Sequence, residues 1–228
     1  MKKLTILTGA GISAESGIQT FRDGDGLWEN HNITDVASPE GWRKDRNLVL
    51  EFYNQRRRQL HEVQPNEAHH LLAELEKHFK VNIITQNIDD LHERAGSTDI
   101  LHIHGELFKS CSSNNKSLIY EQKEDIKMGD LAEDGSQLRP FIVWFGEDVP
   151  LYETAKDIVK EADILVVIGT SLQVYPAAGL IHDIKDDCLL IVINPNETGF
   201  GYGQRAVVMK EPATKGMKLL FDKLVNLA

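Results

Sequence analysis

Cysteine is scarce in this chain, and no run of apolar residues approaches the length of a membrane span. Two cysteines among 228 residues, Cys111 and Cys188, are too few for a disulfide framework or a zinc site made of four thiolates. A span needs about 18 apolar residues in succession, and the N-terminus shows no small-residue cleavage site of a signal peptide. We therefore expect a soluble cytoplasmic protein without a membrane partner.

Positive charge is also in short supply. Lysine and arginine number 25 against 35 aspartates and glutamates, so the formal net charge is −10 at pH 7. A chain with this balance repels the phosphate backbone of nucleic acids and is suited to attract basic protein segments. The charge therefore argues against a nucleic-acid partner.

Apolar residues are instead gathered in short runs that predict buried parallel strands. These runs are rich in Ile, Val and Leu and do not alternate with polar residues, as expected when both faces of a sheet are covered. They span residues 4–8, 81–85, 164–170 and 189–194. Segments with helical spacing separate them, at residues 66–79, 154–162 and 212–227. This alternation predicts an α/β fold with a doubly wound, mostly parallel, Rossmann-like sheet.

Two polar stretches, residues 24–64 and 109–139, interrupt this alternation. We interpret both as insertions that form a smaller domain beside the sheet within one unit spanning the whole chain. The larger part then comprises residues 1–23, 65–108 and 140–228. A cleft between the two parts is where a ligand is expected to bind.

The first strand runs into a glycine-rich turn, "LTILTGAGISAESGIQTFRDGDG" (residues 4–26), which matches the G-x-G-x-x-G/A dinucleotide pattern. Its glycines allow backbone N–H groups to approach a pyrophosphate at a helix N-terminus. The acidic residue that holds the ribose in redox enzymes, about 20 residues on, is missing. Arg22 offers a second phosphate contact, although a lone arginine is more often a surface residue.

Polar residues also follow the other predicted strands. Gln86, Asn87 and Asp89 in "TQNIDDLHERAG" (85–96) come directly after a buried strand, where ligands bind in such folds. The alternative is a polar loop in which an aspartate caps the following helix. The segments "IGTSLQVYPAAGL" (168–180) and "INPN" (193–196) offer a phosphate site and a ribose contact from Asn194, or ordinary turn chemistry.

A pair of histidines lies in "LHIHGEL" (101–107). His102 and His104 could ligate a metal, but further ligands are not evident in the sequence. They could also be one solvated and one core histidine. The chemical alternative is a histidine with a pKa near neutrality that serves as a general base.

Taken together and in this order, the motifs resemble the sirtuin family of NAD-dependent protein-lysine deacylases. The resemblance is carried by "GAGISAESGIQTFR", "TQNIDDLHERAG", "HGEL", "VWFGE" (143–147) and "GTS", and it spans nearly the whole chain. It implies that NAD is consumed as a co-substrate and that no hydride is transferred. The implied partners are proteins that carry acyl-lysine.

The resemblance implies a role for each matching residue. His104 is the catalytic general base. The cofactor-binding residues are Gly9, Ala10, Gly11, Ser13, Glu15, Phe21, Arg22, Trp28, Gln86, Asn87, Ile88, Asp89, Gly169, Thr170, Ser171, Asn194, Pro195, Asn196 and Ala213. The substrate-binding residues are Tyr53, Arg56, Val143, Trp144, Phe145, Gly146 and Glu147.

The implied reaction begins when the acyl-lysine carbonyl oxygen attacks the anomeric carbon of the nicotinamide ribose and nicotinamide leaves. His104 then deprotonates a ribose hydroxyl that attacks the acyl carbon, which gives free lysine and O-acyl-ADP-ribose. Residues 143–147 would lie along the substrate as a strand and read its backbone. The segment "TFRDGDGLW" would be a mobile loop over the cofactor.

One departure from the family concerns zinc. Sirtuins carry two cysteine pairs that hold a structural zinc, whereas only Cys111 lies in the corresponding region here. A single thiolate cannot form a closed tetrahedral site, so we expect no metal site and no zinc. Polar contacts, or a small apolar cluster around Leu118, Ile119 and Tyr120, would then stabilise the small domain.

The segment "EFYNQRRR" (51–58) bears on which acyl group is removed. Tyr53 and Arg56 are three residues apart on a predicted helix and share a face, where a hydroxyl and a guanidinium suit a carboxylate. From the residues alone, a solvated basic face with a packed Tyr53 is the favoured interpretation of the segment. The resemblance favours the class III bacterial sirtuins, which remove succinyl and malonyl groups and also acetyl.

Other functions remain open at this point. They are a deacetylase without acidic-acyl preference, a protein mono-ADP-ribosyltransferase, a non-catalytic module that binds NAD or ADP-ribose, and a metal-dependent hydrolase built on His102 and His104.

Overall fold

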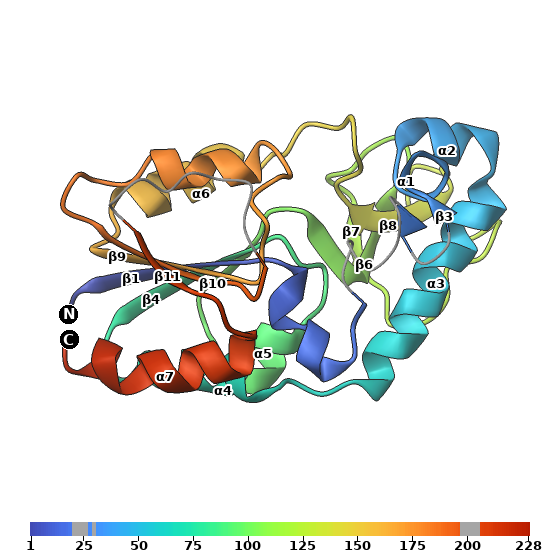
Figure 1. Ribbon diagram of the computed structural model, residues 1–228. Helices are drawn as coiled ribbons and strands as arrows, with labels where there is room; N and C mark the ends of the chain where they lie inside the picture. The colour runs from blue at the N-terminus through green and yellow to red at the C-terminus, as the bar shows by residue number, and fades with distance from the viewer. Residues whose placement is uncertain (20–26, 29–30, 197–205) are drawn as a thin grey trace.

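A six-stranded parallel sheet forms the larger part of the molecule (Figure 1). The structure is a computed structural model that describes residues 1–19, 27–28, 31–196 and 206–228, with only the backbone of 27 and 28. In their spatial order the strands are β11 (Ala206–Met209), β10 (Leu189–Ile193), β9 (Ile164–Ile168), β1 (Lys3–Thr8), β4 (Lys80–Thr85) and β5 (Ile100–His102). The chain runs outward from β1 in both directions, so the strand order reverses between β1 and β9. The predicted doubly wound α/β fold is confirmed.

The four predicted strands are all present, and their side chains are buried on both faces. Every residue of β9 is buried, which explains its unbroken apolar run. The strands β5 and β11 were missed by the sequence pattern. Both are short and lie at the edges of the sheet, and Val207 and Val208 of β11 are exposed.

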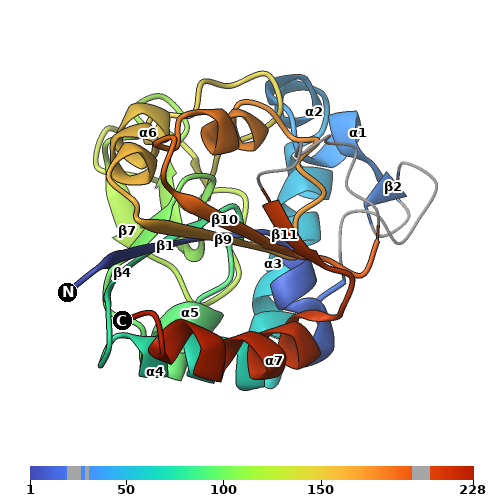
Figure 2. The same ribbon diagram turned by 60° about the vertical axis from the view of Figure 1, so that its left-hand side comes forward.

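Helices cover the two faces of the sheet (Figures 1 and 2). On one face, α4 (Glu67–Leu75) and α7 (Ala213–Val225) pack against the strands, with α5 (Leu91–Ala95) beside α4. On the other face lie α6 (Tyr152–Lys160) and the 3₁₀ helix η3 (Ala177–His182). The three predicted helices thus occur close to their expected places, and Asn66 caps α4 by accepting a hydrogen bond from the Ala68 N–H.

A second group of elements packs around its own apolar core at the right of Figure 1. It contains α1 (Ile33–Val36), α2 (Pro39–Lys44), α3 (Arg46–Glu62), the short pair β2 (Leu27–Trp28) and β3 (His31–Asn32), and an antiparallel sheet in the order β7 (Ile119–Glu121), β6 (Gly105–Ser112) and β8 (Leu138–Ile142). We call this group the small lobe. The expected boundaries at residues 108 and 140 fall inside β6 and β8, and the division into domains stays a prediction.

Polar contacts stabilise the end of the small lobe that contains Cys111. The buried Ser112 hydroxyl donates to Asp134 Oδ2 at 2.6 Å and accepts from the N–H groups of Asn114 and Asn115. The alternative apolar cluster is wrong, because Ile119 is 44% exposed. Among the described residues, no group of three or more His, Cys, Asp or Glu is placed to hold a metal.

The helices carry no sign of a membrane span. Within the described ranges, none is both long enough and apolar enough to cross a bilayer.

Candidate active site

A cavity of about 540 Å³ lies between the sheet and the small lobe. Its walls come from the segments that follow β1, β4, β9 and β10, together with residues 142–147 at the end of β8 and beyond it. Carboxyl ends of parallel strands meet at one edge of a sheet, and a reversal of strand order leaves a crevice there. The volume is in the ordinary range for a small-molecule site.

Most residues that the sequence predicted for the site contribute to this cavity. The lining includes Gly9, Ala10, Gly11, Glu15, Tyr53, Gln86, Asn87, Ile88, Asp89, His104, Val143, Trp144, Phe145, Gly146, Glu147, Gly169, Thr170, Ser171, Asn194, Pro195, Asn196 and Ala213. Ser13 and Arg56 are not in the lining. Phe21 and Arg22 lie outside the described residues, as does the side chain of Trp28.

The glycine turn after β1 forms the 3₁₀ helices η1 (Ala10–Ile12) and η2 (Ala14–Ser16). Its glycines allow close approach of a second turn after β9. A Cβ on Gly11 would lie 2.6 Å from Gly169 Cα, and the Gly11 N–H donates to the Gly169 carbonyl at 2.8 Å. Two of the predicted cofactor segments are therefore packed directly on each other.

A hydrogen-bonded chain joins the segment after β4 to this glycine turn. Asn87 Nδ2 donates to Ser13 Oγ at 3.1 Å, and Ser13 Oγ donates to Asp89 Oδ2 at 3.0 Å. All three residues are buried, and burial raises the pKa of Asp89 to about 6. Asp89 Oδ1 also accepts from the Leu91 N–H, but the N-cap of α5 is Asp90, which makes no capping hydrogen bond with its side chain, so the expected aspartate cap is absent.

His104 follows β5 and faces the cavity. Its Nδ1 lies 3.1 Å from the Gln86 carbonyl oxygen, which can only accept a hydrogen bond, so Nδ1 carries the proton and Nε2 keeps its lone pair. Burial lowers the pKa of His104 below its ordinary value, which favours the neutral form. A neutral imidazole held in one tautomer is suited to accept a proton.

His102 is buried outside the cavity lining, where its two ring nitrogens lie near Asn87 O and Glu93 Oε1. His102 is thus the core histidine of the pair, whereas His104 is partly exposed at the cavity wall.

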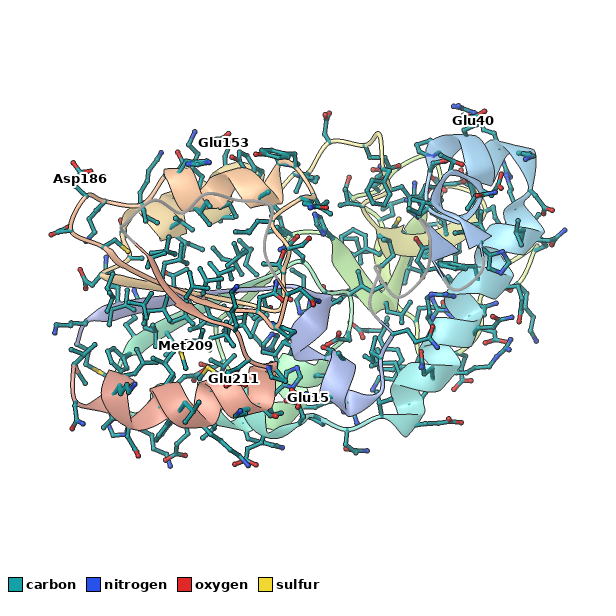
Figure 3. All side chains as sticks on the ribbon, in the orientation of Figure 1. Glu15, Glu40, Glu153, Asp186, Met209 and Glu211 are labelled. Carbon is teal, nitrogen blue, oxygen red and sulfur yellow. The ribbon has the colours of Figure 1, made fainter. Side chains whose placement is uncertain are left out.

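The segment after β10 is tied to the turn after β9. Asn194 Nδ2 donates to the Thr170 carbonyl at 2.8 Å, and Gln86 Nε2 donates to Thr170 Oγ1 at 3.1 Å. Glu15 contacts the beginning of α7 (Figure 3), where its carboxylate accepts hydrogen bonds from the N–H and the hydroxyl of Thr214. The predicted cofactor residues thus also join four separate strand ends.

The other side of the cavity contains the predicted substrate residues. Trp144 Nε1 donates to the fully buried Tyr53 hydroxyl at 3.1 Å. Arg139 stacks on the Trp144 ring and donates to Glu147, whose carboxylate also pairs with Lys116. The segment 143–147 is a turn and belongs to no strand, so its alignment with a substrate strand stays a prediction.

The three arginines of α3 lie in different environments. Arg56 and Arg57 are buried, whereas the Arg58 side chain is 51% exposed and pairs with Glu51 and Asp125. The solvated-face alternative is therefore wrong for two of the three. Arg56 donates to the Phe52 carbonyl, and its guanidinium lies over the Phe52 ring.

Several lining residues carried no chemical signal in the sequence. They are apolar or small residues, most of them in loops between the named elements: Ala14, Ile18, Ala37, Ile142, Val149, Val174 and Pro176, with the exposed Tyr175. Apolar and small residues of this kind look the same in a sequence whether they line a cavity or cover a core.

Comparison with known proteins identifies the class to which this fold and site belong. The Sir2 family model matches residues 9–176. A protein of Helicobacter pylori (strain 26695) named NAD-dependent protein deacylase is 58% identical over 228 residues, covering 100% of both chains. One of the same name from Bacteroides thetaiotaomicron is 54% identical over 231 residues, covering 99% of each. A Sir2 homologue solved as a mutant with ADP-ribose superposes with a TM-score of 0.89 at 38% identity, covering 100% of this chain and 94% of that one. The chain belongs to the Sir2 family.

Proposed function

We propose that this Sir2 protein removes succinyl, malonyl and acetyl groups from protein lysines in the cytoplasm. The general activity rests on the comparisons alone. The chain is an NAD-dependent protein deacylase, which is the name of its full-length relatives at 54% and 58% identity. The finer part, the acidic acyl group, is our inference from Tyr53 and Arg56. It is supported by the burial of both side chains one turn apart beside the cavity.

The residues present fit an NAD molecule. The cavity offers backbone groups at four strand ends, the glycine turn and the polar side chains of Asn87, Asp89 and Asn194. We assign Gln86, Asn87 and Asp89 to the nicotinamide and its ribose, and Asn194 to the adenosine ribose. NAD supplies the ribose carbon that accepts the acyl oxygen and nicotinamide as the leaving group.

The chain's own contribution to the reaction is orientation followed by proton transfer. Orienting the weakly nucleophilic amide oxygen of the acyl-lysine against the anomeric carbon is a proximity problem that a closed cleft serves. His104 Nε2 then accepts the proton of the ribose hydroxyl that attacks the acyl carbon. The neutral tautomer imposed by the Gln86 carbonyl is the form that this step requires.

The peptide is assigned to the segment 143–147, which reads its backbone. Arg139 stabilises this segment by stacking on Trp144 and pairing with Glu147. Recognition through the backbone leaves the sequence around the lysine loosely specified.

The acyl end is assigned to Tyr53 and Arg56. Burial raises the pKa of Tyr53 well above its ordinary value, so its hydroxyl stays protonated, and Trp144 orients it. The positive charge of Arg56 is near enough to act on the Tyr53 hydroxyl. A guanidinium in a buried position makes a stronger charge-assisted bond to a carboxylate than one in water.

The test compares Arg56→Met with the control variant Arg58→Met on one peptide carrying succinyl-lysine or acetyl-lysine. Loss of a charge-assisted contact of about 1.5–3 kcal/mol predicts that Arg56→Met lowers kcat/KM for desuccinylation about 10–100-fold. Deacetylation should change little, and Arg58→Met should change neither, because Arg58 lies on the solvent side of α3.

Equal loss of both activities in Arg56→Met would show that Arg56 supports α3 or the cleft, and the acidic-acyl assignment would be dropped. Mass spectrometry of the products distinguishes deacylation from mono-ADP-ribosyl transfer, the other enzyme class considered. O-acyl-ADP-ribose marks deacylation, whereas ADP-ribosylated protein marks transfer to the protein.

A further inference from the structure

The backbone of Asn87 is held at both of its polar groups by side chains outside the cavity lining. Its N–H donates to Thr85 Oγ1 at 3.0 Å, and its carbonyl oxygen lies 3.1 Å from His102 Nδ1. Thr85 and His102 are register partners on the neighbouring strands β4 and β5. The ends of two strands therefore fix the backbone of Asn87, the residue assigned to the nicotinamide.

His102 is itself held from its other ring nitrogen. Its Nε2 lies 2.6 Å from Glu93 Oε1, and Glu93 belongs to α5, on the far side of the ring from Asn87. The ring thus lies between a carbonyl oxygen and a carboxylate oxygen, which are both acceptors, and this arrangement is satisfied when both nitrogens carry protons. A buried group with two such partners has one orientation.

The electrostatic surroundings agree with this protonation. Burial alone lowers the pKa of His102, but the hydrogen bond and charge of Glu93 outweigh it and the net shift of the pKa is upward. Glu106 on β6 acts in the same direction. Asp89 also lies near enough to interact with the charge of His102.

We propose that His102, braced by Glu93, is a positioning residue for the release of nicotinamide. It fixes the Asn87 carbonyl and thereby the direction from which the Asn87 side chain enters the cavity. The proposal rests on the role assigned above to Asn87. Displacement of a reacting geometry by about 1 Å can cost about 100-fold in rate, so a residue that never touches the substrates can still set kcat.

His104 makes a parallel contact one residue away. Its Nδ1 binds the Gln86 carbonyl while its ring faces the cavity, whereas His102 binds the Asn87 carbonyl and stays outside the lining. The two histidines of "HIH" therefore hold consecutive carbonyl groups but act on different steps. His104 serves proton transfer after nicotinamide has left, and His102 serves the step in which it leaves.

Two matched variants separate the contacts of His102. The amide nitrogen of an asparagine lies where Nδ1 of histidine does, and that of a glutamine lies near Nε2. His102→Asn therefore keeps the donor to Asn87 and loses Glu93, while His102→Gln keeps Glu93 and loses Asn87. Both replace a buried imidazole by an amide, so circular dichroism and thermal unfolding serve to confirm that each is folded.

The readouts are steady-state deacylation and the exchange of labelled nicotinamide into NAD, which reports the first step alone. We expect His102→Gln to lower kcat and exchange together by at least 10-fold, with little change in KM for the peptide. His102→Asn should retain both within about threefold. His104→Ala, in contrast, should lose product formation while exchange persists.

Equal loss in the two His102 variants, or no loss in His102→Gln, would overturn the positioning role. Loss of product formation with exchange intact would also overturn it, because His102 would then act through His104. Wild-type protein that releases no nicotinamide from NAD and acyl-lysine peptides would refute the proposed function itself, which is a different result from any of these.

Discussion

The Nδ1 atom of His104 donates a hydrogen bond to the Gln86 carbonyl oxygen at 3.1 Å. Gln86 directly follows β4 and His104 follows β5, so this bond joins the ends of two adjacent strands at the wall of the cavity. It leaves Nε2 of the neutral ring without a proton, and His104 lines the cavity. The bond therefore connects the fold of the sheet with the chemistry assigned to the imidazole.

Replacement of this imidazole is expected to abolish product formation. His104→Ala should lower deacylation by about 10²–10⁴-fold, which is the usual contribution of a positioned base. NAD binding, followed by calorimetry, should persist. The control is His70→Ala on the exposed side of α4, which should be fully active. Near-normal turnover by His104→Ala would remove the assignment of His104 as the base.

Asn87 should matter more to nicotinamide chemistry than to stability. Asn87→Ala removes one side-chain hydrogen bond, to Ser13, which is worth about 1 kcal/mol. Its melting temperature should therefore fall by only a few degrees, while nicotinamide release falls at least 100-fold. Asn82→Ala, which removes a bond to Asp99 from β4 away from the cavity, is the matched control and should stay active. A variant of Asn87 that melts early but retains activity would show a structural role only.

The buried carboxyl of Asp89 predicts a specific pH dependence of stability. Its pKa of about 6 lies above the ordinary value of 3.8, so the folded state binds the proton more tightly than the unfolded state. The resulting stabilisation is complete below about pH 4 and is lost as the pH rises through 6. At about 1.4 kcal/mol per pKa unit, the loss is about 3 kcal/mol.

Asp89→Asn should remove this dependence. The free energy of unfolding of Asp89→Asn minus that of wild type, both measured in urea, should therefore rise by about 1–3 kcal/mol from pH 4.5 to pH 7. The same relative stability of the two proteins at both pH values would mean that Asp89 is ionised throughout this range. Deacylation should be lost in Asp89→Asn at either pH.

The small lobe is expected to be stable without zinc, because only one cysteine is present in the region where the family places its metal site. Elemental analysis of the purified protein should find no stoichiometric zinc, and chelators should leave its melting temperature unchanged. One zinc per chain would contradict the prediction.

The polar contacts of Ser112 predict where the stability of this lobe resides. Ser112→Ala leaves Asp134 and two backbone N–H groups without their partner and should cost about 1–3 kcal/mol. Ser117→Ala, at an exposed position in the same loop, should cost less than about 0.5 kcal/mol. Thermal unfolding of the two variants checks the difference, and equal effects would contradict it.

The sequence by itself determined the fold class and most of the cavity. The apolar run that forms β9 is buried along its whole length. An unbroken run of this composition is typical of strands covered on both faces, so it predicts a parallel strand from the sequence alone. Because the carboxyl ends of such strands meet, polar residues directly after them, such as Gln86 and Asn194, could be placed in one site before their contacts were known.

The tertiary structure alone decided which partner each polar group has. The three adjacent arginines of α3 look alike in the sequence, yet Arg56 and Arg57 are buried and Arg58 is exposed. His102 and His104 share one motif but bind different carbonyls. The sequence left open whether polar contacts or an apolar cluster stabilise the small lobe, and only the structure shows the contacts of Ser112. Burial and hydrogen bonding depend on atoms that are distant along the chain, such as Glu93 and Asp134. Local periodicity carries no information about such pairs, because only the packing of the whole chain brings them together.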